Sequence, residues 1–131
     1  MADRHAPTAE ELDALARTAI ARLPDAFRAL LDGVIVRVED FAEEDVLAEM
    51  GIADAWELTG LYTGVAVGQK SIADSGALPD MIHLFRLPLL LEWIETGVGL
   101  EALITHVVVH EAGHHFGLSD GDMHALEDAA G

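Results

Sequence analysis

Residues 100–120, which read LEALITHVVVHEAGHHFGLSD, carry the information that decides the fold. The stretch predicts one strong helix over about 100–117 that ends at Gly117, because glycine suits the left-handed residue that closes a helix. Leu103 and Val107 precede His110 at helical spacing. This stripe of the helix is therefore expected to face the core of the protein.

His110 and His114 lie four residues apart on this predicted helix. At that spacing two side chains are separated by roughly 40° around the helix axis and about 6 Å along it, so two imidazoles can bind one ion from the same side. Histidines at the inner end of an apolar stripe need a partner, because unpaired buried polar groups are costly. A metal ion would be that partner, and Asp120, three residues after the Gly117 turn, is placed to return as a third ligand.

Three protein ligands and one open position for water are the pattern of catalytic zinc rather than structural zinc. Glu111 directly follows the first ligand and is predicted to act as general base toward that water. Asp122 and His124 remain rival third ligands in place of Asp120. The remaining histidines of the stretch are interpreted differently: His115 as a neighbour of the site or a surface residue, and His106 as structural.

The segment HEAGHHFGLSD matches the pattern HExxHxxGxxD, and it resembles the aspartate-ligand branch of the zincin metallopeptidases, close to the metzincins. The short chain and its continuation GLSDGDM also look like the small bacterial proteins of the minimal zincin-like metallopeptidase family. The resemblance implies His110, His114 and Asp120 as zinc ligands and Glu111 as base. It further implies an edge strand before the active-site helix that pairs with an extended peptide, and residues 81–86 are expected to be that strand.

The remainder of the chain predicts further helices and strands around this segment. Helices are expected after the capping box at Thr8 and up to Pro24, then over 25–31, 42–50 and 89–95, with a terminal helix over about 123–129. Strands are expected over 34–38, as a buried strand, over 61–67 and over 81–86, with a loop over 69–79. On these strands, His83 could face a substrate and Tyr62 could stabilise an oxyanion.

These elements predict an α+β fold in which residues 1–131 form a single zincin-like domain, with a small mixed sheet of about three strands packed against helices. The composition is 51% hydrophobic and 24% charged, which is typical of a globular chain. No apolar run reaches the roughly 18 residues of a membrane span. The chain has no cysteine, so a metal site must use His, Asp and Glu. Without a recognisable export signal, a cytoplasmic protein is expected.

The sequence therefore predicts a zinc-dependent hydrolase, a metallopeptidase that binds one zinc ion and cleaves peptide or protein substrates. The alternative is a non-catalytic zinc-binding module that binds peptides at its sheet edge, and hydrolysis of a small amide or ester also stays open. The net charge of −17 disfavours nucleic-acid and membrane partners and would attract basic peptides. The sequence does not fix the oligomeric state or the cleavage preference, and a monomer fits it.

Overall fold

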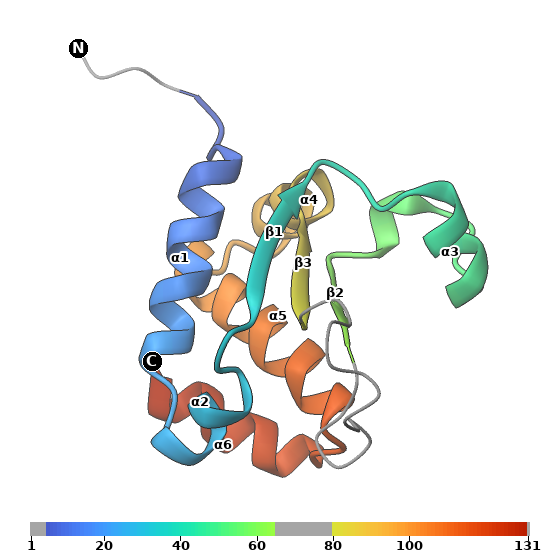
Figure 1. Ribbon diagram of the computed structural model, residues 1–131. Coiled ribbons are helices and arrows are strands. Elements are labelled where there is room, and N and C mark those ends of the chain that lie inside the picture. Colours follow the sequence, from blue (N-terminus) through green and yellow to red (C-terminus); the bar gives the residue numbers. More distant parts are fainter. Residues whose placement is uncertain (1–4, 65–79, 131) are drawn as a thin grey trace.

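The computed structural model describes residues 5–64 and 80–130. In chain order it contains helices α1 (Ala9–Ala21) and α2 (Asp25–Leu30), strand β1 (Ile35–Glu39), helix α3 (Glu44–Met50), a 3₁₀ turn η1 (Ala55–Glu57), strands β2 (Gly60–Thr63) and β3 (Met81–Phe85), and helices α4 (Arg86–Thr96), α5 (Leu100–His115) and α6 (Asp120–Ala130). This arrangement of helices around a small mixed sheet confirms the predicted α+β class (Figure 1).

The sheet has the strand order β1-β3-β2, so β3 is the central strand. β3 pairs in parallel with β1, where Val36 faces Ile82, and antiparallel with β2, where Tyr62 faces Ile82 from the other side. The prediction that residues 81–86 form an edge strand is therefore wrong, and β2 is the edge strand that contacts α5. The predicted buried strand over 34–38 is likewise an edge strand, in which Ile35 remains 42% exposed.

The main core lies between one face of the sheet and helices α1 and α5 (Figure 1). Alternation along the strands sends Val36, Tyr62, Ile82 and Leu84 into this core. They meet apolar side chains of the two helices: Leu12 and Ala16 from α1, and Leu103, Ile104, Val107 and Val108 from α5. α5 is thus held firmly under the sheet, which fixes the direction of the side chains that it carries.

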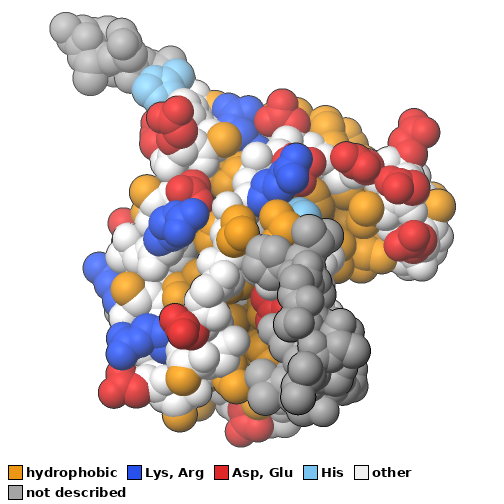
Figure 2. Space-filling model, in the orientation of Figure 1, with side chains coloured by type: hydrophobic (Ala, Val, Ile, Leu, Met, Phe, Trp, Pro, Cys, Tyr) orange, Lys and Arg blue, Asp and Glu red, His pale blue; other side chains and the backbone are white. Residues whose placement is uncertain are grey.

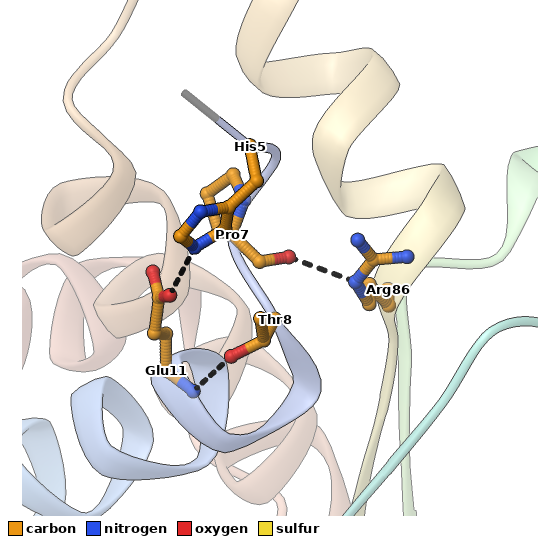
Figure 3. A network of polar contacts seen from close by, with 5 residues as sticks. All are labelled: His5, Pro7, Thr8, Glu11 and Arg86. Atoms are coloured by element: carbon orange, nitrogen blue, oxygen red, sulfur yellow. Dashed lines mark hydrogen bonds and ion pairs between the residues drawn. The ribbon is translucent and has the colours of Figure 1, made fainter. Parts of the chain in front are cut away.

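The first helix begins where its capping box predicts. The Glu11 N–H donates to the Thr8 hydroxyl at 3.1 Å, and the Glu11 carboxylate meets the His5 ring at 3.0 Å (Figure 3). The side chain of Arg86 donates to the Pro7 carbonyl at 2.8 Å, which connects the segment before α1 to the start of α4 (Figure 3). Pro88 lies within the first turn of α4, which directly follows β3, and its missing N–H costs nothing there.

The acidic side chains of this protein are spread over the surface in Figure 2 and extend onto α3, whose first turn carries Glu44 and Asp45. No described helix is long and apolar enough to cross a membrane. Two predicted segments lie wholly or partly outside the described residues: the loop over 69–79, and the second strand, of which only the part before residue 65 is described.

Candidate metal centre

Helix α5 carries the two histidines of the predicted site at the point where it leaves the core. Val107, Val108 and Val109 are at most 5% exposed, whereas His110 is half-buried and His114 is exposed. The two imidazole rings lie one turn apart, with centroids at 5.5 Å and planes at 86°. The predicted i, i+4 arrangement is therefore present, on a helix that the core holds in place.

The end of α5 takes the form that the glycine predicts. Gly117 has a φ of +75°, and the Leu118 N–H donates to the Gly113 carbonyl at 2.8 Å, the six-to-one bond of a Schellman motif. The chain turns here, and Ser119 begins α6 by accepting a hydrogen bond from the Asp122 N–H at 3.1 Å. α6 thus starts at Asp120, three residues earlier than predicted.

We expect Gly117→Ala to lower the free energy of unfolding by about 1 kcal/mol, because a left-handed backbone costs a residue with a Cβ about 1–2 kcal/mol and the more rigid unfolded chain returns part of that. Gly121→Ala, inside α6 and in ordinary space, is the matched control and should stabilise by about 0.5–1 kcal/mol. Urea denaturation measures both changes, and equal effects of the two variants would contradict this role of Gly117.

Close packing brings α6 back against α5. Met123 is fully buried, and a Cβ added to Gly113 would collide with its side chain, so the absence of a side chain at Gly113 allows the helices to approach. The two helices border a cavity of about 590 Å³ that His110 and Asp120 both line. Asp120 is exposed at the first position of α6.

The electrostatic surroundings of His110 suit a metal ligand. Its pKa is lowered, first by burial and then by the neighbouring His106 and His114, while the carboxylates of Glu127 and Asp120 oppose this. A lowered pKa keeps the ring neutral, with a lone pair free for a cation. Two imidazoles and a nearby carboxylate are also a donor set that zinc accepts. By donor chemistry, the predicted residues fit zinc.

Glu111 lies between the two helical histidines in sequence and points toward strand β2. A Cβ built on Gly60 would lie 3.4 Å from its Cγ, so the Glu111 side chain lies beside the edge strand, while the lack of a side chain at Gly60 makes room for Val107, whose Cγ1 would be 2.6 Å away. Burial raises the pKa of Glu111, and the nearby His114 opposes the effect. A half-buried carboxyl group of raised pKa in such a position has the properties of a general base.

The tightest group of candidate ligands in the described part of the chain differs from the predicted set. The ligand atoms of His106, His110 and Glu127 all lie within 4.8 Å of one another. The His106 and His110 rings have centroids 4.0 Å apart, and His106 Nδ1 pairs with Glu127 Oε1. Of the predicted ligands only His110 belongs to this group, and within the described residues His110, His114 and Asp120 do not form a group of that closeness.

His106 is expected to be structural because three in-line histidines cannot share one tetrahedral ion. The pair His106 and His110, however, has the same spacing of four residues as His110 and His114. The spacing was the available signal. Glu127 had none, because only the packing of α6 on α5 brings it to the histidines.

The other candidates have partners of their own. The Tyr62 hydroxyl donates to Asp80 Oδ2 at 2.8 Å, and the Tyr62 ring packs 4.2 Å from that of His115, whose buried Nε2 has no hydrogen-bond partner among the described residues. Burial, and after it the hydrogen bond to Asp80, raises the pKa of the Tyr62 hydroxyl above its ordinary value. His83, on the central strand, lies between Thr63 Oγ1 at 3.1 Å and Glu39 Oε1 at 3.4 Å.

Both rival third ligands, Asp122 and His124, belong to α6. The Asp122 carboxylate accepts the Ser119 N–H at 3.4 Å and so completes the cap of the helix. The His124 side chain is 78% exposed and its Nδ1 lies 3.9 Å from Glu127 Oε2. His124 lines the same cavity as His110 and Asp120.

A comparison with protein-family models matches residues 31–130 to the family described as zincin-like metallopeptidase. The matched range runs from the end of α2 to the end of α6 and includes the whole sheet and the helix with both histidines. No curated protein matches the chain significantly.

Proposed function

Because the chain belongs to the zincin-like metallopeptidase family, we propose that it is a zinc-dependent peptidase in which His110, His114 and Asp120 hold the metal and Glu111 is the general base. The observation that carries the proposal is the arrangement on α5. Two imidazoles lie one turn apart, and the half-buried carboxyl group that follows the first of them points toward the sheet edge.

Bound zinc would supply a Lewis acid and lower the pKa of its water to about 7. Glu111 would act as general base toward the attacking water and then as general acid toward the leaving amine. Burial favours the protonated form of Glu111, so the residue holds the proton more firmly than an exposed glutamate would. His110 and His114 hold their positions because α5 is packed against the core.

An extended peptide would bind along β2. Within the described residues this strand is the edge of the sheet on the side of Glu111, the place where a peptide could add by β-augmentation. β2 takes over the role that the sequence assigned to residues 81–86. The net charge of −17 would favour peptides with basic residues.

The second candidate is a zinc-binding module that holds peptides without cutting them. One observation favours it: His106 and Glu127 place two more donors beside His110. Additional protein ligands would fill the position that water needs. The two functions differ in what the metal does, and both can be examined in one experiment.

We expect the purified protein to contain zinc and to hydrolyse members of a broad peptide library. Removal of the metal with a chelator should abolish hydrolysis, and one equivalent of zinc should restore it, because water is a weak nucleophile without the metal. Elemental analysis and mass spectrometry of the products make the measurement. Unchanged hydrolysis by metal-free protein would contradict a zinc peptidase, and bound zinc without hydrolysis would favour the interaction module.

A further inference from the structure

The cleft between α5 and α6 holds a group of side chains that the proposed peptidase chemistry does not use. His106 lies one turn before His110 on α5, and Glu127 reaches them from the last turns of α6. The three line one wall of the cavity of about 590 Å³. The group is built from two helices that the core packs together, with the Glu127 side chain only 17% exposed and that of His106 50% exposed.

We infer that His106, His110 and Glu127 form a second seat for a divalent transition-metal cation of the zinc class. The seat shares His110 with the proposed catalytic set but takes His106 and Glu127 in place of His114 and Asp120. The inference does not depend on peptidase activity. It requires only that this cleft bind a cation, whatever the protein does with its other histidines.

The donor chemistry supports this seat. Two imidazoles and one carboxylate form a mixed set that suits zinc, cobalt or nickel better than calcium or magnesium, which prefer oxygen ligands alone. The ligand atoms lie within 4.8 Å of one another, and small rotamer changes would bring them to a common ion. His106 is exposed enough to make such a change, while the more buried Glu127 supplies a fixed anchor.

A simple ion pair between His106 and Glu127 is the alternative explanation of the contact. It accounts for two members of the group but requires nothing of His110, whose ring lies 4.0 Å from that of His106. Because the proposed seat shares His110 with the catalytic set, a cation in it would change the environment of a catalytic ligand. The zinc concentration around the protein would then affect the proposed catalytic site through the occupancy of this second seat.

The test removes His114 and Asp120, the two proposed catalytic ligands that this seat does not use, and asks whether zinc still binds. In the full-length variant His114→Ala/Asp120→Ala, freed of metal, we expect calorimetry to show one bound equivalent of zinc. Adding His106→Ala or Glu127→Gln to this variant should weaken the binding by at least about tenfold, since even the indirect supports of a metal ligand contribute that much. His5→Ala is the matched control, an exposed histidine outside this cavity, and should change the affinity less than twofold.

Zinc binding that is absent from the His114→Ala/Asp120→Ala variant, or that survives His106→Ala unchanged, would overturn the inference and leave an ion pair only. Circular dichroism checks the fold of each variant. Wild-type protein provides a second measurement that no substitution can disturb: the ring signals of His106 in NMR spectra should shift during a zinc titration. A catalytic site that fails while this seat binds zinc, or the reverse, would separate the two proposals.

Discussion

Glu111→Gln is expected to lower the rate of peptide hydrolysis by about 10²–10⁴-fold, the contribution typical of a positioned general base. Glutamine keeps the size of the side chain and its place beside Gly60, but it cannot take a proton from water. Glu111 is not among the proposed ligands, so the zinc content should stay the same. Steady-state kinetics and elemental analysis of the same preparations measure the two quantities.

Glu95→Gln is the matched control, the same substitution on an exposed position of α4, and it should leave the rate unchanged. Equal hydrolysis by wild type and Glu111→Gln would exclude Glu111 as the base. A parallel loss of zinc and activity would instead assign Glu111 to metal binding.

The stability of the metal-free protein gives an independent reading of Glu111. Burial raises the pKa of this carboxyl group above its ordinary value of 4.5, so the folded state binds the proton more tightly than the unfolded state does. The free energy of unfolding therefore falls as pH rises through that range, and this loss of stability persists at pH 7. Glu111→Gln removes it and should leave the metal-free fold at least as stable at neutral pH, with the difference disappearing in acid. Lost activity in this variant would then not reflect lost structure.

Local signals in the sequence predicted the elements that hold the site. The N-cap at Thr8, the helix over about 100–117 and its end at Gly117 are confirmed, because caps, helical periodicity and a left-handed glycine act within a few residues. The mixed sheet of three strands and the family are confirmed as well. The residues for which the sequence predicted metal binding stay a prediction.

Relations between distant segments could not be predicted in the same way. Whether β3 or β2 forms the sheet edge depends on which strands pair, and the apolar residues of β3 fit an edge or a centre equally well. The helix α6 begins three residues earlier than predicted because Ser119 caps it by accepting the Asp122 N–H. The sequence pattern at Ser119 and Asp120 is interpreted as part of a metal site and not as a helix start. The approach of Glu127 to His106 depends on the packing of α6 on α5.

Asp120→Asn is expected to weaken zinc binding by about 100-fold or more, the upper end of what even indirect supports of a ligand contribute. The amide keeps the shape of the carboxylate but loses the charge that faces His110 across the cavity. Asp120 is exposed in the first turn of α6, so the metal-free stability should fall by no more than about 0.3–1 kcal/mol, the contribution of a negative charge near a helix N-terminus. Competition with a chromogenic chelator measures the affinity.

Asp122→Asn provides the decisive contrast, because it makes the same chemical change two residues away. An amide oxygen can still accept the Ser119 N–H, so this variant should lose only the negative charge in the first turn of α6, about 0.3–1 kcal/mol of stability, and it should keep its zinc affinity within twofold. The reverse result, with zinc lost in Asp122→Asn and retained in Asp120→Asn, would move the third ligand to Asp122. Zinc retained in both variants but lost in His124→Ala would assign it to His124. Among the described residues the Asp122 carboxylate caps the helix and the His124 ring lies near the Glu127 carboxylate, which favours Asp120 as the third ligand.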